Sequence, residues 1–205
     1  MSAIRKIAWL LVLAAMIAGA GVVVSRTLRP PAKVTAHQSA QAMVKSEFDL
    51  IDHRGNQVSE AAFAGRWQLV FFGFTYCPDI CPTTLATIAQ VLDLLGGQAK
   101  RVAPLFITVD PERDTPEILA EYVSAFHPEI TGLTGTPEQV RAATRSFRIF
   151  YGKQNDEHAP GGYVMSHSGY IYLMDPEGRY EAVFTEKRDA AEQIAAAIKQ
   201  RLEDD

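Results

Sequence analysis

The chain has 205 residues and a net charge of −4, with 47% hydrophobic and 21% charged residues. These values are ordinary for a globular protein, and they leave no basic field that would favour nucleic acid. The length allows one domain of common size together with additional segments.

The N-terminal segment is typical of a membrane anchor. Residues 7–24 form an uncharged apolar run, near the lower limit of about 17–25 residues for a bilayer span. A cleaved signal peptide is the alternative, because Ala18-Gly19-Ala20 resembles a cleavage site. The run continues past that site, whereas signal peptides have apolar regions of only about 7–15 residues, so an uncleaved anchor is favoured.

Three parts of the chain are therefore expected. Residues 1–24 form the N-terminal membrane anchor or signal peptide. Residues 25–45 form a flexible linker, since they contain Pro30-Pro31 and show no apolar periodicity. Residues 46–205 form the folded domain, which either export route places outside the cytoplasm. Basic residues lie on both sides of the span, so the charge distribution does not indicate which end faces the cytoplasm.

Within the domain, short apolar runs alternate with helical patterns. The expected strands cover residues 47–52, 67–74, 102–109, 170–174 and 180–185. The expected helices are one through residues 85–95 and three that open near residues 115, 136 and 189. A polar, glycine-rich loop is expected at residues 152–162.

This order of elements predicts an α/β fold of the thioredoxin-like type, with a mixed central sheet and helices on both faces. The first buried strand runs towards Cys77. Open α/β sheets place their sites at the C-terminal ends of strands. The functional site is therefore expected around Cys77.

Both cysteines lie in one short segment, Cys77-Pro-Asp-Ile-Cys81. A strand-to-helix turn places Cys77 beside free backbone N–H groups and the positive end of a helix, and both stabilise a thiolate. Three residues separate the cysteines, whereas the thioredoxin redox motif has two. A structural disulfide is an alternative, although so short a loop constrains the unfolded chain little. Inert buried thiols are a further alternative.

Two thiolates favour soft metal ions, first Cu(I) and then zinc. A structural zinc site takes four protein ligands, and the sequence holds no further cysteine to complete one. Two sulfurs and one nitrogen suit three-coordinate copper. His167 is the favoured nitrogen ligand, because in a thioredoxin-like fold its loop lies next to the cysteine turn. The other histidines lie in the linker, a turn, a helix end and the polar loop: His37, His53, His127 and His158.

Three motifs in order strongly resemble the Sco/SenC family. They are GFTYCPDICP at 73–82, VDPERDTP at 109–116, and Ser166-His167-Ser168 followed by YLMDP at 172–176. The resemblance covers Glu47 to about Leu202, together with the anchor. Members of this family are membrane-tethered copper chaperones that help assemble the dinuclear copper centre of cytochrome c oxidase.

The resemblance implies that Cys77, Cys81 and His167 bind copper in its Cu(I) and Cu(II) forms. The implied partner is the copper-receiving subunit of cytochrome c oxidase, with other copper chaperones or thiol reductants as further partners. The implied location is the bacterial inner membrane, with a single span and the soluble domain in the periplasm.

One position departs from the family pattern. Family members commonly have Asp directly before the ligand histidine, whereas this chain has Ser166. A change beside a ligand can cost about 10–100-fold in metal affinity, so weaker copper binding is expected. Residues 110–116 are expected to cap a helix, with Arg113 paired to an acid on the surface. The family implies that this loop lies beside the metal turn and faces the client protein.

The leading hypothesis is a copper metallochaperone, which turns over no substrate. The alternative is a thiol–disulfide oxidoreductase, in which Cys77 and Cys81 form a redox-active pair acting on the cysteines of a copper protein. A peroxiredoxin-like peroxidase is a third hypothesis, and it requires one attacking thiol of low pKa.

Overall fold

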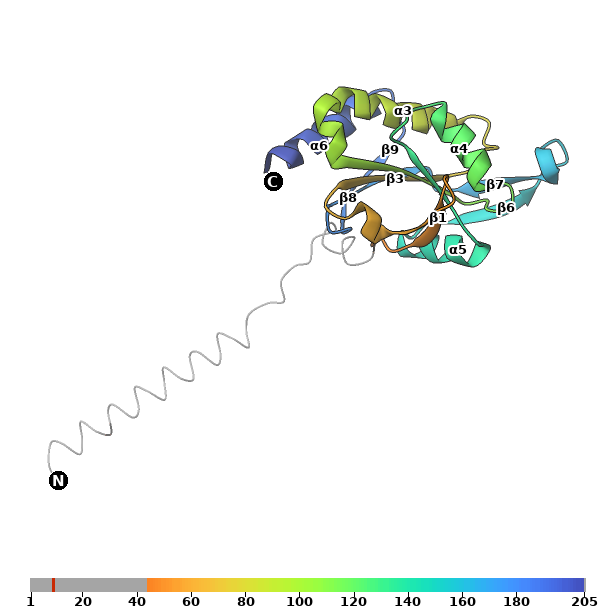
Figure 1. Ribbon diagram of the computed structural model, residues 1–205, viewed down its shortest axis with the longest axis horizontal. Coiled ribbons are helices and arrows are strands. Elements are labelled where there is room, and N and C mark those ends of the chain that lie inside the picture. The colour runs from red at the N-terminus through yellow and green to blue at the C-terminus, as the bar shows by residue number, and fades with distance from the viewer. Residues whose placement is uncertain (1–8, 10–43, 205) are drawn as a thin grey trace. The chain divides into compact units, whose positions relative to one another are not determined.

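The computed structural model describes Trp9 and residues 44–204 (Figure 1). Apart from Trp9, the expected anchor lies outside the described residues, as does most of the expected linker. The packed chain extends back to Val44, which is buried, and the backbone N–H of Lys45 donates to the carbonyl of Ser146 at 3.2 Å. Two residues that the sequence assigned to the linker therefore pack against the domain.

A seven-stranded mixed sheet forms the centre of the domain, in the order β2-β1-β5-β4-β3-β8-β9. Its strands are β1 (Asp49–Asp52), β2 (Gln57–Ser59), β3 (Trp67–Gly73), β4 (Val102–Thr108), β5 (Thr131–Thr134), β8 (Tyr170–Met174) and β9 (Tyr180–Thr185). The neighbours β3, β4 and β5 are parallel, and the remaining pairs are antiparallel. Every residue of β3 and β4 is buried, as is typical of central parallel strands covered on both faces.

Helices cover both faces of this sheet, as the sequence predicted. Among the described residues, the α-helices are α3 (Ile80–Leu95), α4 (Pro116–Ser124), α5 (Pro137–Ser146) and α6 (Ala190–Asp204). Figure 1 shows α3, α4 and α6 on one face and α5 on the other. The connections β3-α3-β4 and β4-α4-β5 advance across the sheet in the same direction, so right-handed crossovers place both helices on one face.

One helix among the described residues is long and apolar enough, by length and composition, to cross a membrane. It runs from Ile80 to Arg101 and joins α3 to the 3₁₀ segment η2 (Gly96–Arg101). Its Leu85, Ile88 and Leu92 are buried in the domain core. The apolar character of α3 is thus explained by its packing in the core.

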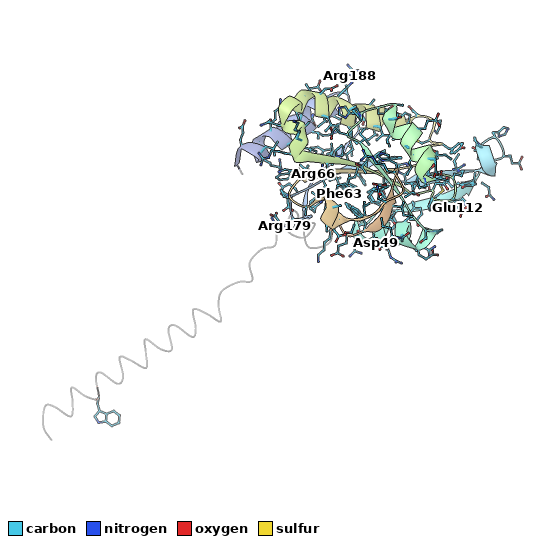
Figure 2. The ribbon with its side chains drawn as sticks, in the orientation of Figure 1. Asp49, Phe63, Arg66, Glu112, Arg179 and Arg188 are labelled. Carbon is cyan, nitrogen blue, oxygen red and sulfur yellow. The ribbon has the colours of Figure 1, made fainter. Side chains whose placement is uncertain are left out.

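Side chains fill the space between the helices and the sheet (Figure 2). The ring centroids of Phe72 on β3 and Phe147 at the end of α5 lie 5.1 Å apart. At the β8–β9 turn, the carboxylate of Asp175 accepts hydrogen bonds from the backbone and the guanidinium of Arg179, at 2.8 and 2.6 Å. This turn joins the two strands that the sequence predicted at residues 170–174 and 180–185, which pair as an antiparallel hairpin.

A second, two-stranded sheet pairs β6 (Tyr151–Asn155) with β7 (Tyr163–His167), and the 3₁₀ turn η3 (Pro160–Gly162) lies between them. The prediction of a loop over residues 152–162 was therefore wrong for 152–155. These residues are polar and largely exposed, so they lack the apolar alternation that marks a strand. Their strand conformation comes from pairing with β7.

Candidate metal centre

The cysteine turn begins where β3 ends, at Gly73, and leads into α3. Cys77 lies in the turn and is half-buried, and Cys81 lies in the first turn of α3 and is fully buried. Pro82 occupies the third position of the helix, where a backbone N–H would have no partner within the helix. Cys81 therefore lies at the start of α3, directly before Pro82.

Three potential metal ligands meet at this turn: Cys77, Cys81 and His167, whose ligand atoms all lie within 4.8 Å of one another. The Sγ atom of Cys81 lies 3.5 Å from Nε2 of His167, and the backbone N–H of Cys81 donates to Sγ of Cys77 at 3.4 Å. Both cysteines are free thiols in the structure. The fold therefore brings together the three residues that the sequence singled out.

The imidazole of His167 is oriented by its neighbours. Its Nδ1 lies 3.2 Å from the carbonyl oxygen of Ser168, and the ring makes an edge contact with Phe74 at 5.8 Å between centroids. A ring that donates from Nδ1 presents the lone pair of Nε2 to Cys81, as metal-binding histidines do. Ser168 and Phe74 therefore both fix the rotation of the ring about its side-chain bonds.

Ser166 faces away from this ring, because successive side chains on a strand point to opposite sides. Its hydroxyl donates to the carbonyl of Gly152 on β6 at 3.3 Å. The family's Asp at this position would share that direction. The weaker copper binding expected from Ser166 stays a prediction.

The two thiols differ strongly in acidity. The pKa of Cys77 is lowered to about 4, chiefly by the hydrogen bond that it accepts from the Cys81 thiol, with the backbone N–H groups of Cys81 and Asp79 adding to the effect. The same hydrogen bond, together with burial, raises the pKa of Cys81. Cys77 is therefore a thiolate at neutral pH, and Cys81 is a protonated thiol.

This difference predicts selective alkylation of the reduced, metal-free protein. We expect iodoacetamide to modify Cys77 nearly as fast at pH 6 as at pH 8, because its lowered pKa keeps it ionised down to about pH 4. An ordinary thiol slows about 50–100-fold over that interval. Peptide mapping by mass spectrometry gives the rate at each cysteine, and Cys81 should stay unmodified. A rate at Cys77 that falls as it does for an ordinary thiol would contradict the assignment.

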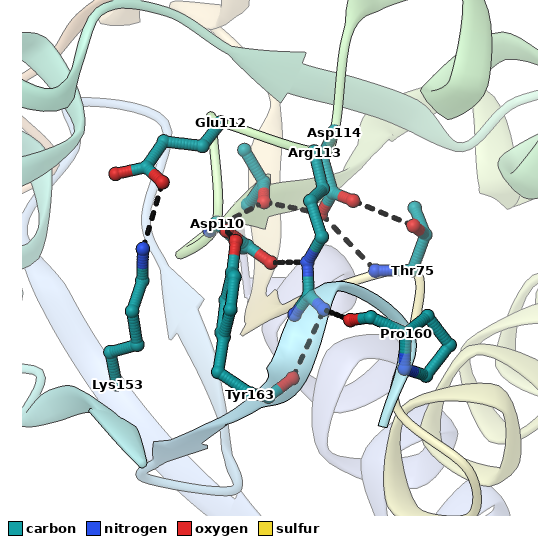
Figure 3. Close-up of polar contacts among 9 residues, drawn as sticks. Thr75, Asp110, Glu112, Arg113, Asp114, Lys153, Pro160 and Tyr163 are labelled. Atoms are coloured by element: carbon teal, nitrogen blue, oxygen red, sulfur yellow. Dashed lines mark hydrogen bonds and ion pairs between the residues drawn. The ribbon is translucent and has the colours of Figure 1, made fainter. Parts of the chain in front are cut away.

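Two further residues support the turn, and the sequence did not reveal their roles. A side chain on Gly73 would place its Cβ 2.8 Å from Sγ of Cys81, so glycine is required for the sulfur to approach β3. Asp114 is fully buried and accepts hydrogen bonds from the backbone and hydroxyl of Thr75, at 3.1 and 2.6 Å, and from the hydroxyl of Thr108 (Figure 3). Burial raises the pKa of Asp114 above its ordinary value.

The motif at residues 109–116 predicted part of this arrangement. The side chain of Thr115 caps α4 by accepting from the backbone N–H of Ile118, as predicted. The prediction of a surface ion pair for Arg113 was wrong, because its side chain is 13% exposed and its partner Asp110 is 2% exposed. Charge alone predicted exposure, whereas partners distant in sequence bury this guanidinium.

Comparison with known proteins now assigns a family. A sequence model of the family described as SCO1/SenC matches residues 36–203. The chain belongs to the SCO1/SenC family. The resemblance noted from the motifs is thereby confirmed.

Relatives support this assignment along most of the domain. The mitochondrial protein SCO2 homolog of Bos taurus is 42% identical over 166 residues, which cover 78% of this chain and 60% of that protein. The SCO2-like protein of Rickettsia felis is 38% identical over 158 residues, which cover 75% of this chain and 77% of that protein. The chain thus spans about three fifths of the length of its bovine relative.

A solved structure gives the same fold. Bradyrhizobium japonicum ScoI with copper bound aligns with a TM-score of 0.71 and 40% identity, covering 77% of this chain and 98% of that chain. The mixed α/β fold with a central mixed sheet is therefore shared with copper-bound ScoI. Two thiols and an imidazole form a donor set that suits a soft metal ion, so the residues present fit copper.

Proposed function

We propose that this SCO1/SenC protein binds copper through Cys77, Cys81 and His167 and passes it to a copper-receiving protein. The convergence of the three donor atoms within 4.8 Å carries this proposal. The cysteines come from one turn, and His167 comes from a strand 86 residues beyond Cys81. Such convergence of soft donors from distant segments favours copper as cargo.

Transfer by ligand exchange follows from the exposure of the three ligands. Cys77 and His167 are partly exposed, whereas Cys81 is buried. Incoming thiolates of a recipient reach the first two before the third, so Cys81 is the last ligand to be replaced. Each exchange replaces one ligand by another, which keeps copper coordinated throughout.

The recipient that we propose is the copper-receiving subunit of cytochrome c oxidase, as the family assignment suggests. The proposed location is the bacterial inner membrane, with residues 1–24 as the anchor and the copper-binding domain, residues 46–205, in the periplasm. The apolar run near the N-terminus and the similarity to a Rickettsia protein support this location.

Copper titration of the full-length, reduced protein tests the proposal. We expect one Cu(I) per chain, and an affinity loss in Cys77→Ala and His167→Ala that exceeds the about 10–100-fold typical of contacts outside the ligand set. His158→Ala is the matched control, because the side chain of His158 is 97% exposed and lies outside the cysteine turn. Unchanged copper stoichiometry and affinity in both ligand variants would refute the copper proposal.

Thiol–disulfide exchange is a second function that the acidities of the two thiols favour. The thiolate of Cys77 attacks a disulfide of the client, breaks its S–S bond and forms a mixed disulfide, releasing one client thiolate. That thiolate takes up the proton of Cys81, whose sulfur then displaces the second client sulfur. The client thereby gains two reduced cysteines, the second protonated by solvent, and Cys77 and Cys81 become a disulfide. His167→Ala separates the functions, because a pure reductase keeps its disulfide-reducing rate in this variant while a copper carrier loses affinity.

A further inference from the structure

The segment from Asp110 to Asp114 connects β4 to α4 and contacts the cysteine turn. Asp114 accepts two hydrogen bonds from Thr75, which lies two residues before Cys77 (Figure 3). The carbonyl of Asp114 also accepts from the hydroxyl of Thr134 on β5 at 2.8 Å. One end of this segment is therefore fixed both to the sheet and to the cysteine turn.

His167 has a different attachment to the domain. It ends β7, which pairs with β6 in a two-stranded ribbon apart from the seven-stranded sheet. A two-stranded ribbon alone is at best marginally stable in water. The ribbon therefore needs contacts with the rest of the domain if His167 is to stay beside Cys81.

Arg113 makes such contacts at the other end of β7. Its Nη1 donates to the carbonyl of Pro160 at 2.6 Å and to that of Tyr163 at 3.1 Å. Its guanidinium carbon lies 3.8 Å from the ring centroid of Tyr163 and 4.8 Å from that of Tyr76, which directly precedes Cys77. The guanidinium thus lies between the ribbon and the cysteine turn.

The position of Arg113 is itself fixed. Its Nε donates to one carboxylate oxygen of Asp110, and the other oxygen accepts from the hydroxyl of Tyr163 at 2.9 Å (Figure 3). A planar guanidinium donates within its plane and stacks on rings with its faces, which an ammonium group does not combine. Because the side chain is largely buried, a guanidinium that lost these partners would keep an uncompensated charge.

A second contact between the ribbon and the segment from Asp110 to Asp114 is weaker. The ammonium of Lys153 on β6 lies 2.8 Å from the carboxylate of Glu112, but the two side chains are 42% and 61% exposed. Exposed ion pairs of this kind contribute little. The buried contacts of Arg113 therefore dominate the attachment of the ribbon to the segment.

We infer that Arg113 is a positioning residue for His167. It holds Tyr163 at the start of β7 against the cysteine turn, and His167 lies at the end of the same five-residue strand. Displacing Tyr163 therefore shifts the imidazole relative to Cys81. This inference rests on the proposed copper site, and Arg113 acts on that site through His167 without contacting copper.

A double-mutant cycle on Cu(I) affinity tests this role, with bicinchoninate as the competing chelator. Arg113→Met keeps a long side chain and removes its charge and its donors. We expect an affinity loss of about 10–30-fold in the chain that has His167. In the His167→Ala chain we expect the same change to cost less than about twofold, because no imidazole remains to be positioned. Equal losses in the two chains, or no loss in the first, would overturn the inference.

Two further variants test whether a general folding defect causes the loss of Cu(I) affinity. Arg145→Met is the matched control, because Arg145 lies exposed on α5, and it should leave the affinity unchanged. Tyr163→Phe keeps the ring and removes the hydroxyl that donates to Asp110, so we expect a loss of about threefold, as for one hydrogen bond. If Arg113→Met does not fold, the same cycle is run with Tyr163→Phe, and a loss that is equal with and without His167 overturns the inference.

A measurement on the metal-free protein separates this inference from the copper proposal. The rings of His167 and Phe74 lie 5.8 Å apart and should give nuclear Overhauser effects between their protons. We expect these to weaken in Arg113→Met and to persist in Arg145→Met. Persistence in Arg113→Met would refute the positioning role even if copper binds. Copper affinity that is insensitive to His167→Ala in the parent chain would refute the copper proposal instead.

Discussion

Asp114→Ala is expected to destabilise the folded domain by about 3–4 kcal/mol. The carboxylate of Asp114 accepts hydrogen bonds from the backbone and hydroxyl of Thr75 and from the hydroxyl of Thr108. Alanine leaves these donors facing a cavity, and each buried donor without a partner costs about 1–3 kcal/mol. Part of this cost is offset, because the variant no longer buries an acidic group. Urea unfolding followed by circular dichroism measures the change.

Asp114→Asn separates the loss of hydrogen bonds from the loss of volume. Its amide keeps the size and one acceptor, so we expect a smaller destabilisation of about 1–2 kcal/mol. Asp93→Ala is the control, because Asp93 lies exposed on α3. A destabilisation by Asp114→Ala that does not exceed that of Asp93→Ala would contradict the role assigned to the buried carboxylate.

The stability difference between the parent chain and Asp114→Asn should change with pH in a direction that follows from the pKa of Asp114. Burial raises the pKa of Asp114 above its ordinary value of 3.8, so the folded state binds the proton more tightly than the unfolded state does. The stability that comes from this group is full below pH 3.8 and falls as pH rises through the raised pKa. The deficit of Asp114→Asn relative to the parent chain should therefore be larger at pH 4 than at pH 7.

The sequence predicted the central elements well because their burial leaves a clear pattern. The strand ending at Gly73 and the helix through Leu85 and Leu92 are apolar at the spacing that each element requires. The two cysteines are four positions apart in the sequence, so their proximity requires no contact between distant segments. The proximity of His167 needed the order of the strands, which the thioredoxin-like pattern supplied.

Elements without such a pattern escaped prediction. The strand β5 has four residues and includes Gly132, so it is too short to show periodicity. The strand β6 is polar, and its pairing with β7 defines it. The burial of Arg113 depends on Tyr163 and Pro160, which lie about 50 residues further along the chain. Contacts between distant segments determine these features, and a local pattern does not record them.

Gly73→Ala is expected to disturb both the fold and the copper site. The added Cβ would lie 2.7 Å from Cε2 of Phe106 and 2.8 Å from Sγ of Cys81, which is closer than real Cβ contacts allow. Overpacking of a filled core costs about 1–3 kcal/mol, and the ring of Phe106 is fully buried with little room to move. We therefore expect unfolding in urea at lower concentration and about 2 kcal/mol less stability.

The way in which this clash is relieved decides its effect on copper. The side chain of Cys81 has one torsion that moves its sulfur, whereas Phe106 is held by the surrounding core, so we expect the sulfur to rotate away from β3. That rotation breaks the 3.5 Å approach to His167, and a loss of Cu(I) affinity of at least about tenfold should follow. Gly97→Ala is the control, because a Cβ at Gly97 meets no atom within 4 Å. A Gly73→Ala protein that is less stable yet binds Cu(I) with the parent affinity would mean that Phe106 yields and that Cys81 holds its place without help from Gly73.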